Sequence, residues 1–482
     1  MNRRDFAKTT AGAAAWTALS ASRILGANDR IGLALVGCGG RGRGVASGVL
    51  GAGNVEYRTM CDVWDQQANA ANKQLADGKA TTARDFRKVL EQKNIDAVHV
   101  ATPDHWHAAV AVLACQAGKD VFVEKPFSLT VREGQAIVAA ARQSKRLVMV
   151  GTQHRSAPHI AEAAQLIQNG YVGDIHYVRV WNSGQVAPNL AAGVPDSAPP
   201  ADLDWDMYLG PAPKVPFNRQ RLGSTYRQFL DYNNGYITDY GNHRIDSVYQ
   251  IMNMDWPLTV AAAGGKFCKQ NGGDIPDVLH VTYEFANFIL EYSAVWTNMN
   301  GRGAGRSPGL NYYGMSGPYN RPHGFAFYGP KGAFYVDRIG YEVFPEVESG
   351  RGEMMAAMAE GMDRRGGAAR GARGAGGGRG GGRRGASDAE VKFRCERKQV
   401  QGADATELHG QNFVKFLRSR QDPFPNAETG HKATATCLLG MIAWKTGRKL
   451  KWDGKKQDFI GDAEASRLLT RAMRKPWDLI KV

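Results

Sequence analysis

A short apolar run that passes through a glycine-rich turn into a helical stretch is the feature that most restricts how this chain can fold. Residues 31–36 are typical of a buried strand, and the turn Gly37-Cys38-Gly39-Gly40-Arg41-Gly42 follows directly as G-x-G-x-x-G. Glycines in this pattern let the backbone turn tightly and approach a pyrophosphate, which the free N–H groups at a helix start can bind. We therefore expect a dinucleotide to be bound by Gly37, Gly39, Gly40, Arg41 and Gly42.

The residue at the end of the next strand-like run predicts which dinucleotide is bound. Residues 55–61 lead to Asp62, which lies 25 positions after Gly37. A carboxylate there can accept hydrogen bonds from the adenosine ribose diol and would repel a 2′-phosphate, so Asp62 favours NAD over NADP. The alternative for Asp62 is an N-cap of the helical run 66–75.

The same alternation continues to residue 150. Strand-like runs at 97–101, 121–123 and 147–150 alternate with helical runs at 108–117 and 131–143. Alternation of this kind implies right-handed crossovers and an α/β fold with a doubly wound parallel sheet.

Polar and aromatic residues follow these strands, and ligands of such sheets bind beyond the carboxyl ends of the strands. We expect one group to contact the cofactor: Thr102, Pro103, His107, Glu124 and Lys125. A second group is expected to contact the substrate: Trp106, His154, Arg155 and, from the second half of the chain, Tyr240. The alternative for Trp106 and His107 is a helix-start cap and a packing residue, and the alternative for Tyr240 is a core residue.

These motifs resemble a known family. The glycine turn, Thr102-Pro103-Asp104-His105-Trp106-His107 and Glu124-Lys125-Pro126 look like the motifs of the Gfo/Idh/MocA oxidoreductases, which include glucose–fructose oxidoreductase and inositol dehydrogenase. Asp239-x-x-x-His243 is similar to the catalytic segment of that family. The resemblance implies an N-terminal Rossmann domain and a C-terminal α/β domain with a large, open, mostly antiparallel sheet. In the family this sheet forms the floor of the substrate site and often an oligomer interface. The resemblance also puts Lys125 near the nicotinamide, with Pro126 often in a cis peptide bond.

The second half of the chain supports this on its own pattern. Residues 281–286 and 288–296 are typical of a hairpin, as are residues 325–328 and 333–336. The stretch 183–216 is rich in Pro, Ala and Gly and is expected to form a long loop over the site.

A helix starting near Thr238 is the most informative element of this half. At 100° per residue, Asp239, His243 and Asp246 fall on one narrow face, and an apolar side with Ile245 falls opposite. The alternative for Asp239 and His243 is a surface pair one helical turn apart.

Oxidation of a secondary alcohol needs a base for the hydroxyl proton while hydride leaves. His243 has a suitable unperturbed pKa, Asp239 can orient it or hold a sugar hydroxyl, and Lys125 can assist if burial lowers its pKa. The family resemblance assigns this work to Lys, Asp and His, and each has a matching position here. Asp104 and His107 with Asp239 and His243 could be imagined as metal ligands, but nicotinamide hydride transfer needs no metal, so no metal is predicted.

The net charge of +15 raises the question of a nucleic-acid partner. Seven arginines and no acidic residue lie in the Gly/Arg-rich tract 364–386, and residues 1–27 contribute a net +3. Without these two segments the chain carries only +5. Most of the net charge therefore lies in these two segments and not on the rest of the chain, and we expect no nucleic-acid partner.

The first 27 residues are typical of an export signal. Arg3 and Arg4 precede Phe6, Lys8 and a weakly apolar stretch rich in Ala and Gly, which is the twin-arginine pattern. We expect a periplasmic or exported protein, anchored to the membrane if the signal is not cleaved. The sequence contains no apolar window of about 20 residues, the length of a conventional transmembrane helix.

Together these observations predict a signal at 1–27, a Rossmann domain at 28–152 and a substrate and oligomerisation domain at 153–482, with a flexible insertion at 351–387. The predicted function is hydride transfer between a tightly held NAD and a secondary alcohol of a sugar, glycoside or polyol, in a homo-oligomer. One alternative is a redox-neutral glycosidase or lyase on the same fold. Another is a polyanion-binding protein without enzymatic activity.

Overall fold

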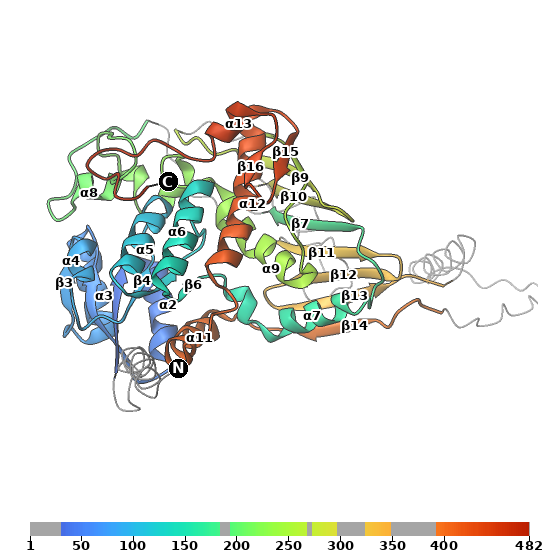
Figure 1. The fold of residues 1–482 in the computed structure, drawn as a ribbon, viewed down its shortest axis with the longest axis horizontal. Helices are drawn as coiled ribbons and strands as arrows, with labels where there is room; N and C mark the ends of the chain where they lie inside the picture. The colour runs from blue at the N-terminus through green and yellow to red at the C-terminus, as the bar shows by residue number, and fades with distance from the viewer. Residues whose placement is uncertain (1–29, 184–192, 268–271, 296–322, 349–391, 482) are drawn as a thin grey trace, which may run out of the picture.

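The computed structural model describes residues 30–183, 193–267, 272–295, 323–348 and 392–481. The predicted signal, the whole predicted insertion and the Gly/Arg-rich tract within it lie outside these ranges. Within them the chain forms a six-stranded sheet and a ten-stranded sheet, seen side by side in Figure 1.

The first sheet is parallel throughout, with strand order β3-β2-β1-β4-β5-β6. Its strands are β1 (Ile31–Val36), β2 (Val55–Cys61), β3 (Thr81–Ala83), β4 (Ala97–Val100), β5 (Asp120–Val123) and β6 (Val148–Val150). The helices between them are α2 (Gly40–Leu50), α3 (Asp65–Ala76), α4 (Phe86–Leu90), α5 (His107–Gln116) and α6 (Val131–Ser144). This order is the doubly wound arrangement that the sequence predicts.

Two elements of the first domain, a strand and a helix, were not predicted from the sequence. Strand β3 has three residues, and two of them, Thr81 and Thr82, are exposed. Helix α4 has five residues. Neither is long enough to show the apolar periodicity by which a strand or helix is recognised.

The second sheet is mostly antiparallel, with strand order β14-β13-β12-β11-β7-β10-β9-β8-β15-β16. Only β7 and β10 pair in parallel among its described strands. The strands are β7 (Tyr177–Ser183), β8 (Thr259–Gly265), β9 (Val278–Glu284), β10 (Ile289–Val295), β11 (His323–Gly329), β12 (Gly332–Asp337), β13 (Gly340–Pro345), β14 (Lys398–Gln401), β15 (Leu450–Asp453) and β16 (Asp458–Phe459). Both predicted hairpins are present, as β9–β10 and β11–β12.

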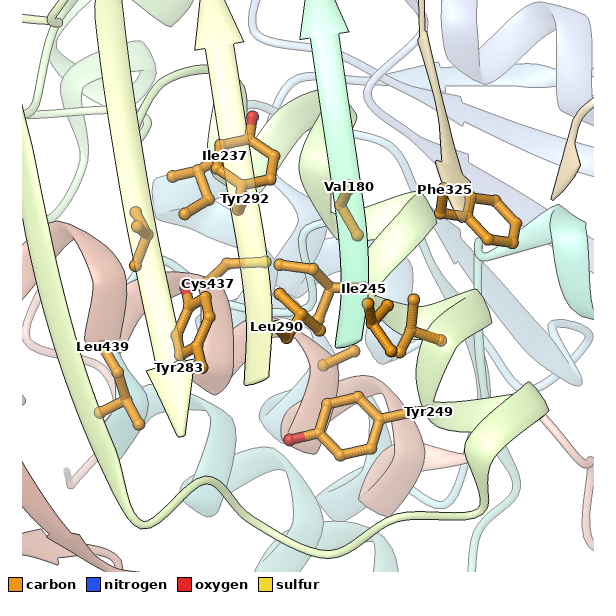
Figure 2. Close-up of a cluster of buried hydrophobic side chains, with 14 of the residues drawn as sticks. Val180, Ile237, Ile245, Tyr249, Tyr283, Leu290, Tyr292, Phe325, Cys437 and Leu439 are labelled. Carbon is orange, nitrogen blue, oxygen red and sulfur yellow. The ribbon is translucent and has the colours of Figure 1, made fainter. Parts of the chain in front are cut away.

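Helices α7 (Pro158–Gln168), α9 (Asn242–Met252) and α12 (Ala427–Thr446) share one hydrophobic core with this sheet. Figure 2 shows part of that core, where Ile245 and Tyr249 of α9 lie against Val180 and Leu290 of the strands. Ile245 and Val248 are fully buried, as the predicted apolar side of α9 requires. This packing fixes the helix that carries the candidate catalytic residues.

The carboxyl-terminal part of the chain returns to the first sheet. Helix α11 (Thr406–Ser419) lies beside α2, and its Phe413 and Val414 are buried in the same cluster as Leu33 of β1 (Figure 1). After the short helix α13 (Ala463–Arg467) the chain runs back toward α5 and α8 (Trp205–Leu209). In the described part of the chain, no helix is both long and apolar enough to cross a membrane.

Candidate active site

The glycine turn between β1 and α2 lines a cavity of about 730 Å³ at the carboxyl ends of the first sheet. Gly37 has a φ of +91°, and a Cβ on it would lie 2.4 Å from the backbone carbon of Ala101. A Cβ on Gly42 would lie 2.3 Å from the carbonyl oxygen of Gly37. These two glycines are therefore required by the turn itself.

Gly39 and Gly40 differ from them, because a Cβ on either would meet no atom within 4 Å. The described chain thus leaves open space beside Gly39 and Gly40, where helix α2 begins. The first N–H groups of a helix have no partner within the helix and carry its positive dipole end. The turn is suited to hold a pyrophosphate, as the sequence predicts.

Asp62 ends β2 and also lines the cavity. Its two carboxylate oxygens accept hydrogen bonds from the backbone N–H groups of Cys38, at 2.7 Å, and Trp64, at 2.9 Å. Burial raises the pKa of Asp62 to about 6, although both hydrogen bonds oppose the rise. The N-cap of α3 is Trp64 rather than Asp62, so the alternative assignment of Asp62 as that N-cap is wrong.

Thr102, Pro103, Trp106 and His107 follow β4 and line the same cavity. The His107 ring lies between two carbonyl oxygens, with Nδ1 2.7 Å from that of Pro126 and Nε2 2.9 Å from that of Thr102. Trp106 donates from its indole nitrogen to the carbonyl oxygens of Met207 and Tyr208. Both side chains therefore use their polar atoms to hold the cavity wall.

Glu124 and Lys125 follow β5, and the Lys125–Pro126 peptide bond is cis, as the family resemblance implied. Arg41 of the glycine turn donates from Nε to Oε1 of Glu124 at 3.0 Å. Lys125 pairs with Oδ1 of Asp239 and also donates to the backbone oxygen of Asp239 at 3.1 Å. Lys125 thus connects the end of β5 with the stretch that carries Asp239, and both residues line the cavity.

Asp239 and His243 come from one continuous stretch, a π-helical turn (Ile237–Gly241) followed by α9. Burial alone would raise the pKa of Asp239, but the charges of Lys125 and of Arg227, whose Nε lies 2.9 Å from Oδ2 of Asp239, lower it to about 2. Burial lowers the pKa of His243 well below its usual value, and the charge of Lys125 adds to the effect. Asp239 is therefore an ionised group and His243 a neutral one near pH 7.

The third predicted member of that helix face, Asp246, does not line the cavity. Its buried carboxylate accepts from Nε of Arg155 at 2.8 and 2.9 Å. The π-turn explains the difference, because it changes the angle between Asp239 and the residues of α9 from the 100° per residue of a regular α-helix. The prediction that Asp246 shares the face of Asp239 and His243 toward a cavity is wrong.

Two of the four predicted substrate residues line the cavity and two do not. Trp106 and Tyr240 line the cavity, and the Nζ of Lys125 lies 6.0 Å from the centre of the Tyr240 ring. His154 and Arg155 lie behind it. His154 packs against the His243 ring with 5.2 Å between centroids, and its Nδ1 lies 3.2 Å from the Ser247 hydroxyl.

Several cavity residues were missed from the sequence. Arg227 and Tyr226 come from a 3₁₀ turn (Gly223–Gln228) and Arg338 from the turn after β12, and all three line the cavity. No local pattern distinguishes Arg227 from Arg219 and Arg221 nearby. Only the fold brings it to Asp239.

Unpartnered polar atoms indicate how this cavity could hold a dinucleotide. Within the described residues, Oγ1 of Thr102, Oε2 of Glu124 and Nδ1 of His243 are buried without a hydrogen-bond partner. Buried polar atoms are rarely left unsatisfied. Together with the open space at Gly39 and the acid at Asp62, they fit a nicotinamide dinucleotide that spans the cavity. Nowhere in the described ranges do three His, Cys, Asp or Glu side chains gather as a metal site.

Two family models match this chain. One, described as an oxidoreductase family with an NAD-binding Rossmann fold, matches residues 31–152. The other, described as the C-terminal alpha/beta domain of the same family, matches residues 185–287 and 393–479. The chain belongs to the Gfo/Idh/MocA oxidoreductase family. Its Rossmann domain is of the NAD-binding type.

Curated relatives of this family member are distant. Levoglucosan dehydrogenase of Pseudarthrobacter phenanthrenivorans is 31% identical over 23% of this chain and 30% of its own length. The scyllo-inositol 2-dehydrogenase (NAD(+)) of Bacillus subtilis is 33% identical over 22% of this chain and 31% of its own length. The inositol 2-dehydrogenase of Rhizobium meliloti is 27% identical over 32% of this chain and 46% of its own length. The matches span less than half of each relative.

Solved structures support the fold over a larger part of the chain. The aldose-aldose oxidoreductase of Caulobacter crescentus, complexed with glycerol, has a TM-score of 0.58 at 15% identity and covers 88% of this chain and 99% of its own. Levoglucosan dehydrogenase in complex with NADH and levoglucosan has a TM-score of 0.57 at 16% identity, with the same coverage. At these identities the likeness shows the two-domain fold of the family.

Proposed function

We propose that this protein is an NAD-dependent oxidoreductase that transfers hydride between the cofactor and a secondary alcohol of a sugar, glycoside or polyol. The observation that carries the proposal is the convergence of Lys125, Asp239 and His243 in the cavity that the glycine turn also lines. Relatives named as levoglucosan and inositol dehydrogenases support the choice of substrate class.

The base in this proposal is His243. Asp239 already binds two cationic side chains through its two oxygens, and its pKa of about 2 makes its carboxylate a weak proton acceptor. The imidazole of His243 is neutral near pH 7 because its pKa is lowered by burial. A neutral imidazole at the cavity wall can accept the hydroxyl proton.

Lys125 and Asp239 then have positioning and electrostatic roles. Lys125 is held by the carboxylate and the backbone oxygen of Asp239, so its ammonium is fixed next to the substrate end of the cavity. From there it can donate to the substrate oxygen and stabilise negative charge that develops as the proton leaves. The nicotinamide, when bound, supplies the hydride acceptor.

The preference for NAD is part of the proposal and is supported by Asp62. Its carboxylate is at the adenosine end of the cavity, where the 2′-phosphate of NADP would meet like charge. A redox-neutral glycosidase or lyase is the second candidate. It is favoured by the covering of the cavity by residues 202–226, since a cofactor held under that cover would be reduced and reoxidised within one active site.

Mass spectrometry tests both candidates. The cofactor released on denaturation is identified first, and the protein is then incubated with a panel of sugars, polyols and aryl glycosides. A keto product with reduced cofactor supports the oxidoreductase. Release of the aglycone without net NADH supports the redox-neutral reaction. If no dinucleotide is bound and no compound is converted, both candidates are wrong.

Export and assembly are proposed on separate grounds. The Arg3-Arg4 pattern supports twin-arginine export, which would be tested by cell fractionation of the wild type and of an Arg3→Lys/Arg4→Lys variant. A homo-oligomer is proposed on the family resemblance, in which the second sheet often forms the interface; the chain has a hydrophobic cluster of strand side chains on that sheet, namely Trp181, Ala326, Tyr328, Ala333, Tyr335 and Phe344. Light scattering would give the mass in solution.

A further inference from the structure

Residues 202–232, called the covering segment below, pack against the Rossmann domain and line part of the cavity. The backbone N–H of Asp204 donates to the carbonyl oxygen of Val63 at 2.9 Å, and that of Asp65 donates to Asp202 at 3.1 Å. Leu203 and Trp64 form an isolated antiparallel bridge between these bonds. The covering segment is thus attached directly after Asp62, at the adenosine end of the proposed dinucleotide site.

The covering segment has its own hydrophobic cluster. Its buried members are Leu203, Tyr208, Leu209, Ala212, Phe217, Leu222, Tyr226, Phe229 and Tyr232, and Val63 and Trp64 of the Rossmann domain pack against them. The rings of Trp205 and Tyr208 stack at 5.0 Å. An element with a packed interior of this size is a formed wall rather than a loose loop.

This wall lines the same cavity as the glycine turn. It contributes Leu203, Met207, Tyr208, Leu222, Tyr226 and Arg227 to the lining. The Tyr226 hydroxyl donates to Asp104 at 2.9 Å, and His105 Nε2 lies 2.9 Å from the carbonyl oxygen of Tyr208. A dinucleotide in the cavity would lie against this wall.

The carboxyl-terminal tail holds the covering segment from behind. Arg474 is only 17% exposed and pairs with Asp206 at 2.8 Å. Its guanidinium also donates to the backbone oxygens of Asp206, Gly210 and Ala212 at 2.9 to 3.2 Å. One side chain therefore fixes three points of the segment, through hydrogen bonds whose donor is charged.

Trp477 connects the same tail to the cavity wall. Its indole nitrogen donates to Oδ2 of Asp206 at 3.1 Å, and its ring packs edge-on against Trp106 with 5.5 Å between centroids. Trp106 in turn lines the cavity and donates to Tyr208. The tail, the covering segment and the residues after β4 form one connected structure.

We propose that Arg474, supported by Trp477, locks the covering segment over the adenosine end of the cavity, so that the bound dinucleotide leaves far more slowly than the enzyme turns over. The proposal rests on the proposed function, since it requires a dinucleotide in this cavity. Opening the wall means breaking the contacts of Arg474 with Asp206, Gly210 and Ala212 together. Arg474 and Trp477 are positioning residues in this scheme, as neither lines the cavity.

The test compares Arg474→Ala with Arg448→Ala as a matched control. Arg448 also belongs to the carboxyl-terminal region and binds Asp462 and Glu464 at 2.9 to 3.0 Å, but these partners lie outside the covering segment. Full-length protein carrying its dinucleotide is mixed with excess isotopically labelled NAD, and protein-bound label is followed over time by mass spectrometry. We expect exchange at least about tenfold faster in Arg474→Ala than in wild type, and unchanged in Arg448→Ala.

A second variant keeps the test decisive if Arg474→Ala does not fold. Trp477→Phe retains the ring packing and loses the hydrogen bond to Asp206, and it should raise the exchange rate by a smaller factor. Wild-type exchange faster than turnover, or equal exchange in the wild type and in the folded tail variants, would overturn the lock and leave the proposed function standing. Failure of the wild type to bind any dinucleotide would overturn both.

Discussion

Nε of Arg227 lies 2.9 Å from Oδ2 of Asp239, on a carboxylate whose other oxygen pairs with Lys125. The side chains of Lys125 and Asp239 are 10% and 7% exposed, so the three charges interact with little screening by water. Arg227 therefore takes part in the electrostatics of the site, although it belongs to no recognisable motif. The charge of Arg227 helps to keep Asp239 ionised beside Lys125, which can also donate a hydrogen bond to the substrate oxygen.

Replacing Arg227 by Gln should lower kcat and shift its pH dependence. With one cation lost, the pKa of Asp239 rises from about 2, so the acid limb of the kcat profile moves toward neutral pH. We expect kcat to fall by about tenfold at pH 7, because a lost hydrogen bond between charged groups costs about 1.5–3 kcal/mol and leaves the Asp239 carboxylate less firmly held. Arg227→Lys should restore part of it. The exposed Arg219, changed to Ala, is the control from the same region. An unshifted acid limb in Arg227→Gln would contradict the assignment.

Dinucleotide retention should depend on pH through Asp62. Its pKa is raised by burial to about 6, so below pH 6 the carboxylate becomes protonated and loses the charge that binds a ribose diol. Retained dinucleotide, measured by mass spectrometry after gel filtration between pH 5 and 8, should fall on the acid side. Asp62→Asn should bind more weakly, without this pH step, and should discriminate less against NADP. A wild-type profile as flat as that of the variant would show that Asp62 does not bind the ribose.

The free energy of unfolding should depend on pH in the opposite direction to dinucleotide retention. A carboxyl whose pKa is higher in the folded state, about 6, than in the unfolded chain, about 3.9, binds its proton more tightly when folded. Its contribution to the free energy of unfolding is therefore largest below pH 4 and is lost as pH rises through 6. Denaturant unfolding of Asp62→Asn between pH 5 and 8 should therefore lack this pH-dependent change in the free energy of unfolding.

Substitutions at Gly37 and Gly39 should separate an effect on folding stability from an effect on dinucleotide binding. Gly37→Ala puts a side chain at φ +91° and within 2.4 Å of the backbone at Ala101, so it should reduce the free energy of unfolding by about 1–3 kcal/mol from backbone strain alone. A Cβ at Gly39 meets no protein atom. Gly39→Ala should therefore unfold like the wild type but retain less dinucleotide. Equal retention by Gly39→Ala and wild type would argue against a phosphate at that point.

The first sheet could be predicted from the sequence because its signals are local. Strand β1 is an apolar run, β2 alternates buried and partly buried residues in its first half, and the glycine turn follows β1 within the same stretch of chain. The site was predictable to the extent that its residues follow strands or share a helix, as Lys125 and His243 do. Arg227 and the tail residue Arg474 could not be assigned in this way. Their partners, Asp239 and Asp206, are set by tertiary packing, which leaves no periodic signal in the sequence.

Asp246 and Arg155 show the other limit of prediction from the sequence. Asp246 was expected on the helix face of Asp239 and His243 and Arg155 at the substrate, but their side chains bind each other instead. Their buried pair lies behind the cavity, with side chains 0% and 9% exposed. Arg155→Met leaves an unpaired buried carboxylate and should reduce the free energy of unfolding by about 3–5 kcal/mol, whereas the double variant Arg155→Met/Asp246→Leu should recover much of that loss. Denaturant unfolding measures both. If Arg155 acts only in packing, the double variant should keep the wild-type KM for the substrate. A raised KM in a double variant of wild-type stability would return Arg155 to the predicted substrate role.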